Sequence, residues 1–353
     1  MKDEREPEAI QASFISANGE NGFFSLYDEV FDPKKFDKLY VITGGPGTGK
    51  STLLRRIRQR AVSEGCITEQ ILCSSDPSSL DGVIIEKNGR RVGVLDGTPP
   101  HGRIPKYPAV TEEIIHLGLL WDSEKLRKSK DVIFTLTEKK QRAYACAYAL
   151  LSALGKIHEE ERLRAISLFD EEKAGRQIKH KLQSERRKGE QKVRLFRAFS
   201  SRGETILPFG EQDVKNLLLI GGKETSAEIY LNLFAEKAKK ERLEHTVFLS
   251  PLSSDFPDGV YFPETQTLLI KERLATHLHK GRRIIADRFF SFADNESKEL
   301  TRPKNELIAA AFARLEEAAT IHRAMEAIYG EAMNFSHFDT FAESTIQDIF
   351  AIL

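Results

Sequence analysis

A glycine-rich segment near the start of the chain has the residue types needed to hold a phosphate chain. Residues 44–52 read Gly-Gly-Pro-Gly-Thr-Gly-Lys-Ser-Thr and satisfy every specified position of G-x-x-x-x-G-K-[ST]. Glycines let the backbone curl so that several N–H groups point at one phosphate. Lys50 is expected to reach the outer phosphates, Ser51 to offer its hydroxyl to Mg²⁺, and Thr52 to bind an inner phosphate. The predicted nucleotide-binding residues are Gly45, Pro46, Gly47, Thr48, Gly49, Lys50, Ser51 and Thr52.

The sequence on either side of this segment fits a strand before it and a helix after it. Residues 39–43 form a short apolar run of the kind found in buried parallel strands. Beyond the segment, Leu53, Leu54, Ile57 and Ala61 recur at helical spacing until Gly65. A chance glycine-rich turn is the alternative, and this context argues against it because a helix N-terminus adds its positive dipole end to the site.

A phosphate-bound Mg²⁺ also needs an acid, usually at the end of a neighbouring apolar strand. Residues 92–96 read Val-Gly-Val-Leu-Asp, so Asp96 is the predicted metal-binding acid, with Asp76 and Asp81 as competitors. A simple strand-end turn before Gly97 is the alternative reading of Asp96. Between these acids, residues 83–92 are expected to form a hairpin, since Asn88-Gly89 favours a two-residue type I′ turn.

Further candidates follow Asp96. His101 is predicted to position a water or a substrate, and Arg103 or Lys106 to meet phosphate oxygens; a solvated loop explains them equally well. Residues 111–121 are expected to start an amphipathic helix that ends near Trp121. Phosphoryl-transfer enzymes often receive an arginine from a neighbouring domain, which makes a second-half group worth testing: Arg282, Arg283 and Arg288.

The chain also contains a second, weaker copy of the same unit. At an offset of 177, residues 39–45 align with residues 216–222, and Asp81-Gly82 aligns with Asp258-Gly259. At an offset of 164, residues 147–158 align with residues 311–322, including His158 with His322. The chain therefore reads as a tandem duplication in which each α/β unit is followed by a helical segment.

This internal comparison separates structural from chemical residues. Without a gap, the second copy has Ala227 in place of Lys50 and Glu228 in place of Ser51, and its strand at 267–270 ends in Lys271 rather than an acid. A carboxylate at that place would repel a phosphate, so the second copy is predicted to have lost its site. The Asp-Gly pairs and the two histidines, which both copies keep, are predicted to be structural.

Composition narrows the class of protein. The 353 residues include 53 Lys plus Arg and 53 Asp plus Glu, so no global charge attracts nucleic acid or an anionic membrane. Three cysteines without metal-ligand spacing and the absence of a long apolar run predict a cytoplasmic protein without membrane contact. A nucleic-acid partner is disfavoured because acids interrupt the basic stretch at 179–192.

Three segments in order carry a family resemblance: residues 44–52, Cys-Ser-Ser-Asp-Pro-Ser-Ser-Leu-Asp-Gly-Val at 73–83, and Leu-Asp-Gly-Thr-Pro-Pro-His at 95–101. With them the chain resembles a family of bacterial tandem P-loop proteins labelled ATPase or nucleotide kinase, over nearly its whole length. The resemblance implies ATP binding and supplies no substrate. This chain departs from the family pattern in its second half, where the aligned segment lacks the phosphate-binding lysine.

The expected fold is α/β, with two P-loop NTPase-type units, each with a mainly parallel sheet and a helical extension. Residues 1–195 are predicted to form the nucleotide-binding unit and residues 196–353 the degenerate one. We expect a Mg-dependent ATPase in which Lys50, Asp96 and His101 act on ATP and a water is the nucleophile. A small-molecule or nucleotide kinase is one alternative, and an ATP-gated binding module with little turnover is another. The helical extensions are the expected place for self-association or a protein partner.

Overall fold

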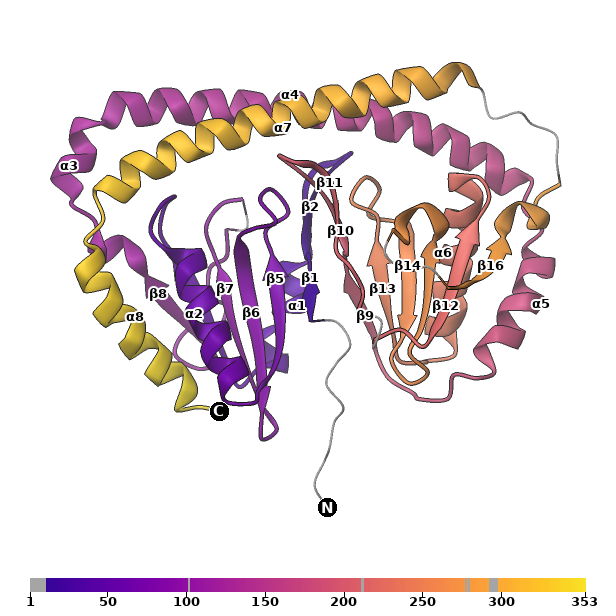
Figure 1. Ribbon diagram of the computed structural model, residues 1–353, viewed down its shortest axis with the longest axis horizontal. Helices are drawn as coiled ribbons and strands as arrows, with labels where there is room; N and C mark the ends of the chain where they lie inside the picture. Colours follow the sequence, from indigo (N-terminus) through magenta and orange to yellow (C-terminus); the bar gives the residue numbers. More distant parts are fainter. Residues whose placement is uncertain (1–10, 101, 211–212, 277, 279, 292–297) are drawn as a thin grey trace.

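Two α/β units with the same strand order make up the chain, and a layer of long helices spans both of them (Figure 1). A computed structural model describes residues 11–100, 102–210, 213–276, 278, 280–291 and 298–353.

The first unit is built on a six-stranded mixed sheet in the order β1-β5-β6-β7-β4-β8. Strand β6 is antiparallel to β5 and β7, whereas the other neighbours are parallel. The strands are β1 (Ala12–Ser13), β4 (Lys38–Thr43), β5 (Ile67–Leu72), β6 (Leu80–Lys87), β7 (Arg90–Asp96) and β8 (Glu112–His116).

The second unit repeats this arrangement in the order β9-β13-β14-β15-β12-β16, with the same strand directions. Its strands are β9 (Gln191–Arg194), β12 (Asn216–Gly221), β13 (His245–Leu249), β14 (Pro257–Phe262), β15 (Thr267–Lys271) and β16 (Arg282–Ile285). Even the irregularity agrees, because the ladder shifts at Ile71/Leu72 in one sheet and at Phe248/Leu249 in the other. The two units are therefore alike in topology as well as in sequence pattern.

Local sequence explains most of the elements of the first unit. The apolar residues of β4 are buried, and helix α2 (Lys50–Ser63) buries Leu53, Leu54, Ile57 and Ala61, as the spacing predicts. The β6–β7 hairpin turns at Asn88 and Gly89, whose φ angles of 53° and 77° are those of the expected type I′ turn.

The helix expected over residues 111–121 is wrong. This segment forms strand β8, which pairs with β4, followed by a short 3₁₀ helix, η2 (Leu117–Leu120). Glu112 explains the difference: its fully buried carboxylate accepts hydrogen bonds from Arg103 and from the backbone N–H groups of Lys106 and Tyr107. These partners fix the segment in an extended conformation.

Two small hairpins join the units at the centre of the molecule. They are β2 (Ser16–Gly19) with β3 (Gly22–Ser25), and β10 (Arg197–Ser200) with β11 (Gly203–Ile206). Next to them, Phe14 and Leu195 exchange two backbone hydrogen bonds of 2.8 and 2.9 Å. Short helices α1 (Tyr27–Val30) and η1 (Pro33–Lys35) complete this part of the first unit.

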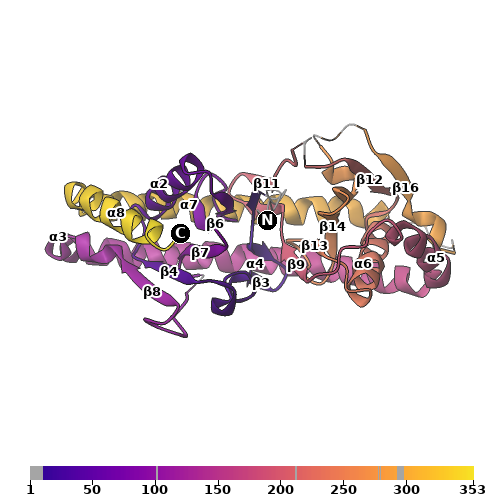
Figure 2. The same cartoon turned by 90° about the horizontal axis from the view of Figure 1, so that it is seen from below.

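Above both sheets, two long helices run antiparallel along the whole molecule (Figures 1 and 2). They are α4 (Lys130–Ser167), which follows the short helix α3 (Ser123–Lys128), and α7 (Lys298–Glu331). Ala147, Leu151 and Leu154 of α4 share a buried cluster with Ala311 and Leu315 of α7. Each helix therefore begins above one unit and ends above the other.

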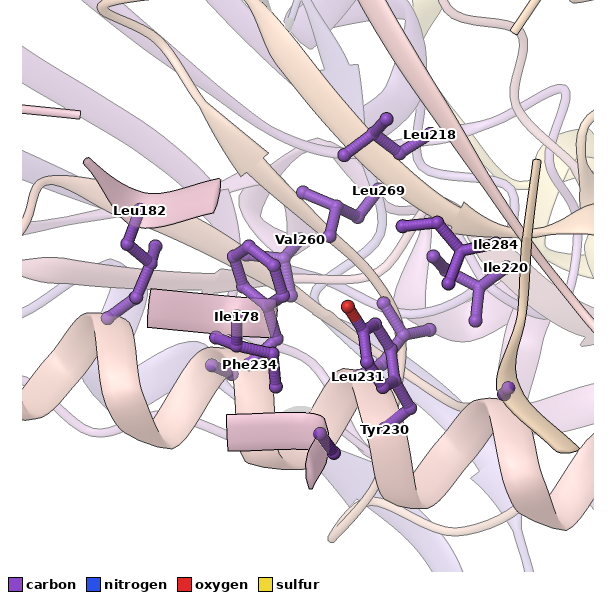
Figure 3. Close-up of a cluster of buried hydrophobic side chains, with 14 of the residues drawn as sticks. Ile178, Leu182, Leu218, Ile220, Tyr230, Leu231, Phe234, Val260, Leu269 and Ile284 are labelled. Carbon is purple, nitrogen blue, oxygen red and sulfur yellow. The ribbon is translucent and has the colours of Figure 1, made fainter. Parts of the chain in front are cut away.

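The helices that follow α4 and α7 complete the core of the opposite unit. After α4, α5 (Glu171–Leu182) packs on α6 (Glu224–Lys240) of the second unit, with Ile178 and Leu182 among the strands and Phe234 (Figure 3). After α7, α8 (Phe335–Phe350) packs on α2, with Phe338 and Ile346 in the core of the first unit. The remaining short helices are η3 (Glu272–Leu274) and η4 (Ala286–Phe289). The domain boundary at residue 195 stays a prediction, although α5, which precedes it, packs on the second unit.

Candidate functional site

The glycine-rich segment is a curled loop between β4 and α2. Strand β4 ends at Thr43 and α2 begins at Lys50, so residues 44–49 form the loop. Gly47 and Gly49 have φ angles of 69° and 84°, which favour glycine, and Thr48 Oγ1 donates a hydrogen bond of 2.9 Å to Gly45 O. The loop therefore sits at the positive end of a fourteen-residue helix, the position predicted for a phosphate site.

The ammonium group of Lys50 folds back over this loop. Its Nζ atom donates to Gly45 O at 2.8 Å and to Gly44 O at 3.3 Å, and it lies 3.8 Å from Asp96 Oδ2. Both side chains are largely buried, with 14% of Lys50 and 11% of Asp96 exposed. A lysine whose charge is met by backbone carbonyls and one distant carboxylate can turn to an incoming anion at small cost.

Asp96 lies beside the loop because β7 ends next to β4, where Asp96 pairs with Ile42. Its Oδ1 atom accepts hydrogen bonds from Thr98 N (2.8 Å) and Thr98 Oγ1 (2.6 Å), which leaves Oδ2 toward Lys50. Burial raises the pKa of Asp96, Lys50 lowers it, and Asp81 raises it again. A cation bound here would offset the cost of holding this carboxylate ionised.

Ser51 and the two competing acids lie close by. Ser51 Oγ accepts a hydrogen bond of 3.0 Å from the backbone N–H of Leu80, the residue before Asp81. Asp81 is buried at the start of β6, and Asp76 accepts hydrogen bonds from Ser78 within its own exposed turn. Of the three acids, only Asp96 pairs with Lys50 among the described residues.

Arg103 and Lys106 have partners of their own, and the place of a third predicted residue is not described. His101 lies outside the described residues. Arg103 is buried against Glu112 at 2.9 Å, and Lys106 forms an exposed ion pair with Asp28 at 3.1 Å. The expectation that Arg103 or Lys106 meets phosphate oxygens stays a prediction.

The arginines of the second half are also misplaced for the role that the sequence suggested. Arg282 and Arg283 lie on β16, the edge strand of the second sheet, on the side of that unit away from the first (Figure 1). Arg283 is paired with Glu272 at 2.7 Å, and Arg288 stacks over Phe289. They cannot serve the loop at 44–49 in this arrangement.

Residues that the sequence did not indicate cover the loop instead. A Cβ atom on Gly47 would lie 2.5 Å from Glu326 O and 3.1 Å from Gly330 N of α7. A Cβ atom on Gly45 would lie 3.1 Å from the Trp121 ring, and one on Gly49 would lie 2.9 Å from Phe338 of α8. The loop is therefore glycine-rich for packing as well as for backbone conformation. The repeated histidine at 158 and 322 was the available signal, because His322 lies one turn before Glu326 on this face of α7.

The equivalent place in the second unit has no such loop. Strand β12 ends at Gly221 and α6 begins at Glu224, which leaves two residues where the first unit has six. The gap-free register that placed Ala227 at the lysine position is wrong, because the first residue of the helix is Glu224. Lys271 does replace Asp96, since Leu95 pairs with Gly82 and Ile270 pairs with Gly259 in matching ladders.

Charged side chains fill this second place. Lys271 is 1% exposed, and its Nζ atom lies 2.9 Å from Glu224, 2.8 Å from Glu228 and 2.8 Å from Asp258. Burial lowers the pKa of Lys271, but the three carboxylates outweigh burial and raise it. Asp258 also binds Arg197 at 2.7 Å. The network satisfies its own charges and offers little to a phosphate.

Comparisons with protein-family models, with curated proteins and with solved structures returned no match. Within the part of the chain that the structure describes, no helix has both the length and the apolar character needed to cross a bilayer. The same residues contain no group of three or more His, Cys, Asp or Glu side chains placed to hold a metal. A cation beside the loop would have to draw most of its ligands from a bound polyphosphate and water, which is the usual habit of Mg²⁺.

Proposed function

We propose that the first unit is a P-loop NTPase unit that binds Mg-ATP, that the second unit is a duplicated copy without a nucleotide site, and that the chain is an ATPase of the tandem family it resembles. One observation carries this proposal. The loop at 44–49 curls at the start of α2, with the Lys50 ammonium 2.8 Å from Gly45 O and 3.8 Å from Asp96.

Each part of this arrangement has a role toward a polyphosphate. The backbone N–H groups of the loop and the N-terminus of α2 bind phosphate oxygens. Lys50 leaves its loop carbonyls and stabilises the negative charge that develops on the transferred phosphoryl group. The donor set fits ATP because it is rich in N–H groups and ammonium, and poor in exposed carboxylates.

Ser51 and Asp96 are the residues that would hold Mg²⁺. Bound Mg²⁺ supplies charge neutralisation between the outer phosphates. Ser51 offers a hydroxyl at the first turn of α2, and Asp96 offers an Oδ2 atom held by the hydrogen bonds from Thr98 to Oδ1. The raised pKa of Asp96 supports this role, because burial of a carboxylate without a full counter-charge is compensated when a cation binds.

An ATP-gated binding module is the second candidate, and the packing of α7 on Gly47 favours it. A loop that moves on binding a phosphate would move the end of a helix that spans both units (Figure 1). Slow turnover with tight nucleotide binding would identify this behaviour. The kinase alternative receives less support, since Arg103 and Lys106 are engaged elsewhere.

The decisive experiment is a thermal-shift series with nucleotides and Mg²⁺, run beside phosphate release. At about one hundred times its dissociation constant, ATP should stabilise the protein by roughly 2.7 kcal/mol. Lys50→Ala should remove this shift, whereas Asp96→Asn should keep binding in the absence of Mg²⁺ and lose phosphate release. An ATP shift of full size in Lys50→Ala would refute the site.

A further inference from the structure

The helical layer places a second lysine near the loop of the first unit. Lys140 is half-buried in the first third of α4, the part of that helix that lies above the first unit (Figure 1), and the charges of Lys50 and Glu326 both act on its pKa. Glu326 belongs to the same turn of α7 that packs on Gly47, and the charges of Lys50 and Lys140 both lower its pKa. Lys140 therefore lies on the part of the helical layer that covers the first unit, near the turn of α7 that packs on the loop.

Within the described residues, no carboxylate contacts the ammonium group of Lys140. It makes no hydrogen bond or ion pair with any residue in the described parts of the chain. Glu326 of α7 lies 3.6 Å from His322 Nε2. Burial lowers the pKa of Lys140, while Glu326 acts in the opposite direction. A half-buried ammonium group that no described carboxylate contacts is suited to an anionic ligand.

The second unit shows how the fold treats the equivalent lysine when no ligand is expected. At the offset of 164, Lys140 corresponds to Lys304 of α7, and Glu161 corresponds to Met325. Lys304 Nζ lies 2.7 and 3.0 Å from the two carboxylate oxygens of Glu161. In the first unit the residue at that place is Met325, which is buried and neutral. The unit that keeps the loop has lost the acid that would neutralise the lysine.

A second pair of equivalent positions also forms a contact above the second unit that the first unit does not repeat. Arg162 of α4 corresponds to Glu326 of α7, and Arg162 lies 3.7 Å from Glu228 in the network of the second unit. Thus the helical layer balances the charges of the second unit with protein groups. Over the loop of the first unit, Lys140 has no ion pair with any residue that the structure describes.

We propose that Lys140 is a phosphate-binding residue that reaches the terminal phosphate of the nucleotide from the helical layer, on the side away from the loop amides. This inference rests on the proposed nucleotide site. It adds that the ligand is held between the first unit and α4, and that the protein distinguishes a triphosphate from a diphosphate. Because α4 continues over the second unit, the terminal phosphate is also the part of the ligand that connects the two halves.

The test compares the affinities of the full-length protein for Mg-ATP and Mg-ADP, measured by titration calorimetry. Lys140→Met should weaken ATP binding by roughly tenfold to a hundredfold, the usual effect of losing one charge-assisted hydrogen bond. ADP binding should change by less than about twofold, because ADP lacks the terminal phosphate. Lys140→Arg should retain most of the preference for ATP. Lys304→Met is the matched control and should leave both affinities unchanged.

The outcomes separate this inference from the proposal on which it rests. Wild-type protein that binds neither nucleotide overturns both. Wild-type protein that binds both, with Lys140→Met binding ATP equally well, overturns only the role of Lys140. Equal losses for ATP and ADP also overturn it, since the contact would then not be specific to the terminal phosphate. Lys140→Gln repeats the comparison if the methionine variant does not fold, as judged by circular dichroism.

Discussion

At the scale of single residues, the two units use equivalent positions with opposite charges. In the first unit, α2 begins at Lys50 and β7 ends at Asp96. At the equivalent positions of the second unit, α6 begins at Glu224 and β15 ends at Lys271. In the first unit the pair is loose, at 3.8 Å, and borders the glycine-rich loop. In the second it belongs to a closed network around Lys271. The exchange of charge therefore goes with the difference between the proposed binding site and a closed charge network.

This difference predicts unequal effects on stability. Lys271→Met should lower the free energy of unfolding by about 3–5 kcal/mol, because it leaves three carboxylates around a buried place without their cation. Asp96→Asn, at the equivalent position, should be neutral or stabilising, since the raised pKa of Asp96 means that its charge is costly in the folded protein. Urea unfolding of both variants measures this. Equal denaturation midpoints for Lys271→Met and wild type would contradict the structural role.

His322 should report nucleotide binding through its pKa. Burial, Lys140 and Lys50 lower the pKa of His322 to about 4, while Asp76 acts in the opposite direction. The neutral form thus contributes stability that is present above the unfolded pKa near 6.5 and is lost as the pH falls toward about 4.

A bound polyphosphate counteracts the two lysines and should raise this pKa. A proton NMR titration with and without Mg-ATP measures the change, and His158, above the second unit, serves as the control. An unchanged His322 pKa at saturating ATP would place the phosphates elsewhere.

Some residues of the site could be predicted from the sequence, and others could not. Lys50 and Asp96 were identifiable because a local motif and a strand end determine their surroundings. Lys140 and Glu326 lie on the long helices α4 and α7, among charged residues that resemble any solvated face. The packing of Glu326 on the loop, and the proposed place of Lys140 beside it, follow from how the helices cross the molecule, which no local pattern specifies.

At the scale of elements, the contact between the loop and α7 gives a sharp comparison between two glycines. Gly47 and Gly65 have nearly the same φ angle, 69° and 70°, but a Cβ atom at Gly65 would meet nothing within 4 Å. Gly65→Ala should therefore cost only the strain of a left-handed residue, about 1–2 kcal/mol. Gly47→Ala should cost more and loosen the end of α7, because its Cβ meets Glu326 O. Chemical denaturation gives the change in the free energy of unfolding of each variant. Equal changes would show that α7 moves away from the added Cβ atom without cost.

The elements themselves were predictable where one short pattern dominates. The strand, loop and helix at 39–63 and the Asn88-Gly89 turn follow from apolar spacing and turn chemistry. The segment at 111–121 was not predictable, because so short a mixed pattern fits a helix or a strand, and the buried Glu112–Arg103 pair decides between them. The gap-free register of the second unit failed because the ladders conserve strand positions but not loop length.

At the scale of the whole molecule, the order of elements along the chain does not match their packing. Helix α5 precedes the strands of the second sheet and α8 ends the chain, yet each completes the core of the unit reached by crossing the molecule (Figure 1). The sequence indicated helical extensions, but their apolar faces fit either sheet equally well. Only the lengths of α4 and α7, 38 and 34 residues, carry α5 and α8 to opposite ends.

This crossed arrangement predicts where a core defect will be felt. Ile178 of α5 and Ile346 of α8 are both buried, and each follows a buried alanine by four residues on its helix. Truncating either isoleucine to alanine should cost about 2–5 kcal/mol.

Because α8 packs on α2, Ile346→Ala should speed amide hydrogen exchange in α2 and β4, far along the chain, and leave α6 protected. Ile178→Ala should do the reverse, since it packs on α6. Exchange measured by mass spectrometry tests both at once, and faster exchange in α6 caused by Ile346→Ala would show that the units are not stabilised by crossed helices. A nucleotide that protects α2 should then also protect α8, which links ligand binding in the first unit to the end of the chain.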